Sequence, residues 1–167
     1  SNFRRHDSWL STATTGARLT LIGTTRPRLA ELESIIDRVA WSEATQHATL
    51  ADLDVGIAPL PDEPYTRGKC GYKLLQYAAA GVPVVATPVG VNRDILSQFG
   101  MPAPGEQGEW VDALVDLLGR PTEARASLGR SARDATKRLY SYDAWLSRWE
   151  EAVGIAGDQR LAAAEAA

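Results

Sequence analysis

The sequence contains few of the residues that bind metals or form disulfides. Its 167 residues include one cysteine, Cys70, which excludes an internal disulfide and a cysteine-based zinc site. Two histidines, His6 and His47, are too few for a histidine-rich metal centre. The longest apolar stretch, 74–91, is interrupted by glycine, proline and glutamine, a pattern that excludes a membrane-spanning helix there. These absences indicate a domain held together by its hydrophobic core alone.

The sequence also lacks a large excess of either positive or negative charge. Eighteen basic residues oppose 21 acidic ones, giving a net charge of −3 and no overall field that would favour nucleic acid. Only three of the basic residues are lysines, and two of them, Lys69 and Lys73, lie within five residues of each other. No signal-peptide core is present in the first thirty residues, so we expect a cytoplasmic protein without a transmembrane segment.

The apolar pattern alternates between short strands and amphipathic helices. Strands are predicted at the β-branched runs 18–22, 38–41, 54–58 and 83–87, each apolar enough to be buried on both faces. Helices are predicted over 27–37, 43–53, 71–80 and 91–98. Beyond residue 109 the pattern predicts helices only, including one over 122–140 and a last helix that begins after an N-cap at Ser141. This order predicts an α/β fold with a doubly wound parallel sheet flanked by helices and an all-helical C-terminal end. We expect one domain over 3–157 and a disordered tail over 158–167.

Residues 54–92 contain the candidate binding residues. In open α/β sheets ligands bind outside the carboxyl ends of the strands, and two loops of this segment leave such ends. Gly68, Cys70 and Gly71 are small enough for a ligand to approach the backbone, and the amides at the start of the following helix favour an anion. Arg67, Lys69 and Lys73 add three cations there, which suits a diphosphate.

Each of these residues also has a purely structural interpretation. The lysines can form a solvated helix start, the glycines can serve turns, and Gln76 can be an ordinary residue of the helix surface. Cys70 fits a small packing residue better than a nucleophile, because no histidine lies near it in the sequence. Trp145 and Trp149, four residues apart, fit packing in the core or against another domain.

Two motifs within this segment are shared with a known family. The runs RGKCGYKLLQYAAAG (67–81) and GVPVVATPVG (81–90) resemble the C-terminal, nucleotide-sugar domain of retaining glycosyltransferases of GT-B architecture, group 1. The resemblance covers residues 18–149 and implies a Rossmann-like domain. The family pattern has two glutamates separated by seven residues, and Gly68 and Gln76 stand at those positions here. The sequence therefore resembles a variant subset in which both carboxylates are lost.

The resemblance implies a role for each matched residue. Backbone amides near Cys70, Gly71 and Tyr72 would meet the donor diphosphate, with Lys73 beside them. Gln76 would face the ribose, Gly23 would border the nucleotide, and Gly68 would lie near the transferred sugar. Lys69 and Arg67 would act catalytically, stabilising charge on the leaving phosphate in place of a metal, so no divalent ion or other cofactor is expected. Asp62 or Glu63 would be placed to compensate for the missing glutamates.

The resemblance further implies an enzyme that transfers a sugar from a nucleotide-diphosphate sugar with retention, working with an N-terminal acceptor-binding domain that the sequence does not include. We therefore expect a domain fragment that is inactive alone, with any contact with a membrane made through the absent domain. Two alternatives remain open. One is a sugar-nucleotide epimerase, for which no matching histidine is found. The other is a non-catalytic module, derived from such a domain, that binds a nucleotide or a partner.

Overall fold

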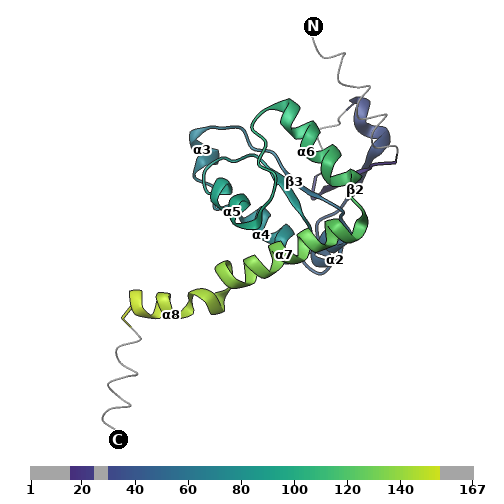
Figure 1. The fold of residues 1–167 in the computed structure, drawn as a ribbon. Coiled ribbons are helices and arrows are strands. Elements are labelled where there is room, and N and C mark those ends of the chain that lie inside the picture. The colour runs from purple at the N-terminus through teal and green to yellow at the C-terminus, as the bar shows by residue number, and fades with distance from the viewer. Residues whose placement is uncertain (1–15, 25–29, 155–167) are drawn as a thin grey trace, which may run out of the picture.

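The computed structural model describes residues 16–24 and 30–154. The predicted tail over 158–167 and the residues 3–15 lie outside the described part. The N-terminal half of that part alternates strands and helices, and the C-terminal half is helical (Figure 1). Within it, no helix is long and apolar enough to cross a membrane.

The four predicted strands are all present, but they do not form one continuous sheet. Strand β1 (Leu19–Ile22) pairs in parallel with β2 (Ile36–Val39), and β3 (Gly56–Ala58) pairs in parallel with β4 (Val84–Ala86). No ladder joins the two pairs among the described residues. A cavity lined by residues of both β1 and β3 lies between the pairs, so their backbones do not meet. The fold is therefore α/β with parallel pairing, and the doubly wound sheet is not confirmed.

The strands also differ in burial. Every residue of β4 is buried, as expected for a strand covered on both faces, whereas every residue of β1 and β2 is only partly buried. The prediction of complete burial is thus correct for β4, holds for Gly56 and Ala58 but not Ile57 of β3, and is wrong for β1 and β2. The outer pair is instead fixed partly by charge, because Arg18 donates to both carboxylate oxygens of Asp37 across the ladder.

The predicted helix over 27–37 is confirmed only in part where the structure describes it, because its helical residues form a 3₁₀ helix and its end is a strand. Residues Ala30–Ile35 form a 3₁₀ helix, η2, and the chain then enters β2 at Ile36. A helical spacing is satisfied by Ile35, Ile36 and Val39, but β-branched residues also favour strands. The pairing of Ile36 with Leu19 stabilises the strand over the helix here.

The other helices lie close to their predicted positions. They are α2 (Gln46–Ala51), α4 (Tyr72–Ala79), α5 (Asn92–Phe99), α6 (Gln107–Gly119), α7 (Thr122–Tyr140) and α8 (Tyr142–Ala152). Ser141 is the N-cap of α8, as predicted, and its hydroxyl accepts from the amide of Ala144 at 3.2 Å. A short helix not predicted from the sequence, α3 (Pro64–Arg67), lies in the loop after β3.

The core lies where α4, α5 and α7 pack around β3 and β4. Its fully buried members include Leu74 and Ala78 of α4, Leu96 of α5 and Ala132 of α7. Small residues bring the helices close together: a Cβ added to Gly129 of α7 would lie 1.7 Å from the carbonyl oxygen of Gly81, which follows α4. This packing fixes the position of α4, whose first residues carry the candidate site.

Helix α8 extends away from this core (Figure 1). None of its residues is buried, and its apolar side chains are largely exposed: Tyr142, Trp145, Leu146 and Trp149. Of the two predicted alternatives for Trp145 and Trp149, packing in the core is therefore wrong, and packing against another domain stays a prediction. Both side chains form part of an exposed apolar face instead.

Candidate functional site

The start of α4 is the centre of the candidate site. Gly71 precedes the helix with a φ of 68°, in the left-handed region that favours glycine. An added Cβ would lie 2.5 Å from Cδ1 of Ile95 and 3.1 Å from Oδ1 of Asn92, so the position has no room for a side chain. Among the described residues, no acceptor binds the backbone amides of Cys70, Gly71, Tyr72 and Lys73. Four free amides at the positive end of a helix dipole are a suitable binding site for an anion.

These amides border a cavity of about 760 Å³, which we call the α4 pocket. Its walls come from the end of β3, the loop that follows, the start of α4 and Asn92 at the start of α5. The loops are held together by a close approach: a Cβ added to Gly90 would lie 2.4 Å from the carbonyl oxygen of Arg67. Thr87, after β4, accepts through Oγ1 from the amide of Leu60 at 3.0 Å. The pocket thus lies at the carboxyl ends of β3 and β4, as the sequence predicts.

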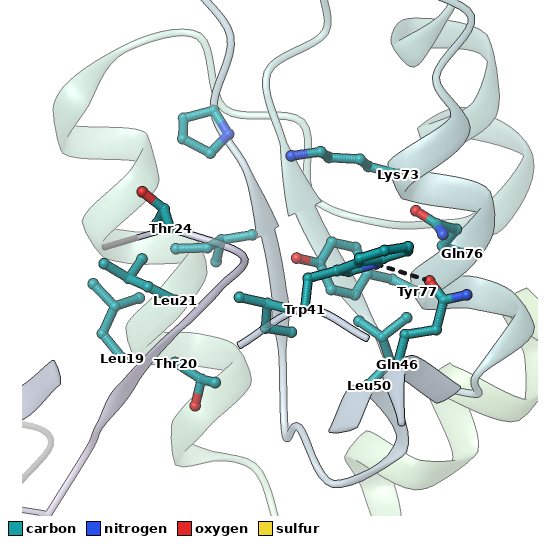
Figure 2. A pocket seen from close by; sticks show the side chains of 13 residues that line it. Leu19, Thr20, Leu21, Thr24, Trp41, Gln46, Leu50, Lys73, Gln76 and Tyr77 are labelled. Carbon is teal, nitrogen blue, oxygen red and sulfur yellow. Dashed lines mark hydrogen bonds between the residues drawn. The ribbon is translucent and has the colours of Figure 1, made fainter. Parts of the chain in front are cut away.

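A second cavity, of about 570 Å³, adjoins the first, and we call it the β1 pocket. Figure 2 shows Lys73, Gln76 and Tyr77 projecting from α4 toward it, opposite Leu21 and Thr24. Trp41 spans its opening, and its indole N–H donates to Oε1 of Gln46 at 3.3 Å. The two cavities share Ile57, Pro59 and Lys73 as wall residues, so they lie next to each other on either side of these residues.

The structure brings most of the predicted site residues together. Six of them line the α4 pocket: Gly68, Lys69, Cys70, Gly71, Tyr72 and Lys73. Gln76 lines the β1 pocket, one turn further along α4. Cys70 is exposed. Lys69 leans over a neighbouring aromatic ring, with Nζ 5.2 Å from the centroid of Tyr65.

Arg67 is placed differently from the prediction. Its side chain is exposed, lines neither cavity, and forms an ion pair with Asp62, with Nε 2.6 Å from Oδ1. The hydrogen bond from Arg67 lowers the pKa of the Asp62 carboxyl, and the same bond raises the pKa of the guanidinium. The expected cluster of three cations is thus reduced to Lys69 and Lys73. Asp62, proposed as a substitute carboxylate, is engaged by this pair.

The turn of α3 explains why Arg67 and Asp62 meet. The amide of Glu63 donates to Oγ1 of Thr66 at 3.1 Å, and that buried hydroxyl donates back to the carbonyl oxygen of Pro61 at 2.5 Å. Pro64 then occupies the first turn, where its missing N–H costs nothing. The short helix closes the loop on itself and directs Arg67 away from the pocket.

Gly23 lies at the edge of the site. Its φ is 76°, and its amide donates to the carbonyl oxygen of Val39 at 2.9 Å, which extends the pairing of β1 with β2 by one residue. Its neighbours Ile22 and Thr24 line the β1 pocket, whereas Gly23 itself is not among the wall residues. This location next to the β1 pocket agrees with the predicted role of Gly23 at the border of the nucleotide site. That role stays a prediction.

No metal-binding cluster is found in the described part of the chain: no three histidine, cysteine, aspartate or glutamate side chains there converge on one point. Burial raises the pKa of Tyr77, whose ring lies under Gly56 of β3. That tyrosine is neutral at physiological pH and contributes an apolar wall to the β1 pocket.

The structure is an α/β domain in which free backbone amides at the start of a helix border a cavity. Residues 8–120 match the family described as Glycosyl transferases group 1, and the chain belongs to this family. No curated protein and no solved structure shows a significant match to the chain. The resemblance noted in the two motifs is therefore confirmed at the level of the family, with glycosyl transfer as its general chemistry.

Proposed function

We propose that this chain is the donor-binding domain of a glycosyltransferase that takes its sugar from a nucleotide-diphosphate sugar and transfers it with retention. The observation that carries the proposal is the row of free amides at the start of α4, which opens on the α4 pocket. A diphosphate at those amides would place its nucleoside in the adjoining β1 pocket and its sugar in the α4 pocket, with Lys73 between them.

The arrangement supports charge stabilisation as the domain's contribution to catalysis. When the bond between the anomeric carbon and the phosphate oxygen breaks, negative charge grows on the departing diphosphate. Preorganised amides and a nearby ammonium stabilise such charge without reorganising during the reaction. Lys73 and Lys69 are the side chains placed for this, and Arg67 is not, because Asp62 already pairs with it. In this proposal the two lysines do the work of a divalent ion.

The acceptor would be bound elsewhere, by an N-terminal partner domain of the same protein. The exposed apolar face of α8 supports such a partner, because Trp145, Leu146 and Trp149 have no packing partners that bury them here. The alternative of a non-catalytic binding module is favoured by Gly68 and Gln76, which replace the two glutamates of the family pattern. The first proposal requires diphosphate binding and turnover in the complete protein, whereas a non-catalytic module requires no turnover and binds either a nucleotide or a partner.

The test is a thermal-shift titration with UDP, GDP and UMP. A ligand present at a hundred times its Kd stabilises the folded state by about 2.7 kcal/mol, which raises the Tm of a chain of this size by roughly 5–10 °C. We expect a shift with UDP or GDP and a much smaller one with UMP. Lys73→Ala should weaken binding about tenfold or more, since a hydrogen bond to a charged group contributes roughly 1.5–3 kcal/mol.

Lys137→Ala is the matched control, because Lys137 is the remaining lysine and lies in the last turn of α7, away from both cavities. It should leave the shift unchanged. Equal shifts for all three nucleotides, or a Lys73→Ala variant that binds like the parent, would contradict the proposal.

A further inference from the structure

Asn92 is one of two polar side chains that are almost completely buried in the described part of the chain, at 1% exposure; the other is Thr66. The hydroxyl of Thr66 is fully used within the turn of α3. The amide of Asn92 is used on one side only, because Nδ2 donates to the carbonyl oxygen of Thr87 at 3.3 Å. A carbonyl oxygen can only accept, so this contact fixes which end of the amide is which. The oxygen Oδ1 must point the other way.

That oxygen faces the start of α4. A Cβ built on Gly71 would lie 3.1 Å from Oδ1, so the oxygen lies over the backbone of Gly71, at the wall of the α4 pocket. No group among the described residues donates a hydrogen bond to it. Oδ1 is not among the fully buried polar atoms that lack a partner, so it meets the open space of the α4 pocket and can accept a hydrogen bond from water or from a ligand there.

The chemistry of such a ligand follows from what surrounds Oδ1. The free amides of Gly71 and Tyr72 line the same pocket and are donors suited to an anion, whereas Oδ1 repels anionic oxygen and accepts only from N–H or O–H groups. The matching ligand therefore carries an anionic group and, a few ångströms away, a hydroxyl. Gly68, Cys70 and Gly71 in the same pocket have no side-chain oxygen to take this role.

Resting on the proposed function, we infer that Oδ1 of Asn92 accepts a hydrogen bond from a hydroxyl of the transferred sugar and so selects the sugar part of the donor. The diphosphate meets the amides, and the sugar extends past Gly71 to Asn92 within the 760 Å³ of the α4 pocket. Asn92 then contributes to binding of the sugar and not to binding of the nucleoside diphosphate alone.

The experiment compares two ligand pairs by calorimetry, UDP with UDP-glucose and GDP with GDP-mannose, on the full chain and two variants. The readout is the ratio of the Kd of the nucleotide to the Kd of its sugar conjugate. Asn92→Leu removes the acceptor, and we expect this ratio to fall about 3- to 10-fold for the pair that the protein binds, as for the loss of one neutral hydrogen bond. Binding of the nucleotide alone should change little.

Asn92→Asp separates this role from a structural one. Aspartate keeps an acceptor at the same place but loses the donor to Thr87, so the structural contact is broken and the sugar contact is kept. Its charge should weaken both members of a pair, leaving their ratio within about twofold of the parent. If Asn92→Leu does not fold, Asn92→Ala replaces it as the variant that removes the acceptor, with the same expected fall in the ratio.

Three outcomes overturn the inference. An Asn92→Leu ratio equal to that of the parent would show that no sugar hydroxyl meets Oδ1. A fall of the ratio in Asn92→Asp as large as the fall in Asn92→Leu would show that Asn92 acts by holding the turn at Thr87. Binding of neither nucleotide nor conjugate by the parent would remove the proposed function itself, and this inference with it, whereas the first two outcomes leave the proposed function intact.

Discussion

Gly71→Ala tests whether the start of α4 has the geometry described. Two costs are expected. An L-residue with a φ near 68° is strained by about 1 kcal/mol relative to glycine. The new Cβ would also lie 2.5 Å from Cδ1 of Ile95, a buried core atom, and such overpacking costs roughly 1–3 kcal/mol. The sum is about 3 kcal/mol, which lowers the Tm by roughly 9 °C for a chain of this length.

Gly100→Ala is the matched control for that experiment. Gly100 follows α5 with a φ of 63°, so the backbone strain is nearly the same, but nothing lies within 4 Å of an added Cβ. We expect a loss of about 1 kcal/mol, or roughly 3 °C. The assay is thermal unfolding followed by circular dichroism, with urea unfolding as a second measure. Equal losses in the two variants would refute the close packing of Gly71 against α5.

The remaining predictions concern α7 and α6. Gly129→Ala would place a Cβ 1.7 Å from the carbonyl oxygen of Gly81, so urea unfolding should show a loss of stability of about 2 kcal/mol. Gly108→Ala is the control, because open space surrounds that position, and it should be neutral or stabilising. A stabilised Gly129→Ala variant would show that α7 does not pack this closely. Glu109 accepts hydrogen bonds from the amides of Gly105 (2.7 Å) and Glu106 (3.1 Å), which lowers the pKa of its carboxyl in the folded protein. Its contribution to stability is therefore fully present above its unfolded pKa of about 4.3. That contribution is lost as the pH falls through the lower pKa of the folded state. Glu109→Gln should therefore flatten the pH dependence of Tm below pH 5, and an unchanged profile would contradict the assignment.

The sequence predicted the helical half of the fold well because its signals are local. Proline at position 121 and the apolar spacing that follows define α7, which spans the predicted residues 122–140, and Ser141 caps α8. The outer strands were located within two or three residues, but their pairing depends on what fills the space between β1 and β3. No local pattern in either strand encodes the cavity found there.

The candidate site was predicted in outline from the glycines and lysines of 68–73, since a loop after a buried strand leads to the sheet edge. The position of Arg67 outside both cavities was not predicted, because its partner Asp62 is five residues away, across a short helix that the sequence pattern did not indicate. The signal was present in Glu63, Pro64 and Thr66, which together favour a helix start. Asn92 was not singled out from the sequence, because its burial arises from packing against the start of α4, which is separated from it in sequence.

The central claim, that the start of α4 binds a diphosphate, is tested most directly by NMR. Titration of ¹⁵N-labelled protein with UDP and GDP should move the backbone amide signals of Cys70, Gly71, Tyr72 and Lys73 most strongly, because these are the free donors at the α4 pocket. UMP should move them far less. Binding of UDP or GDP that leaves these four signals in place, or the absence of binding by either, would contradict the account.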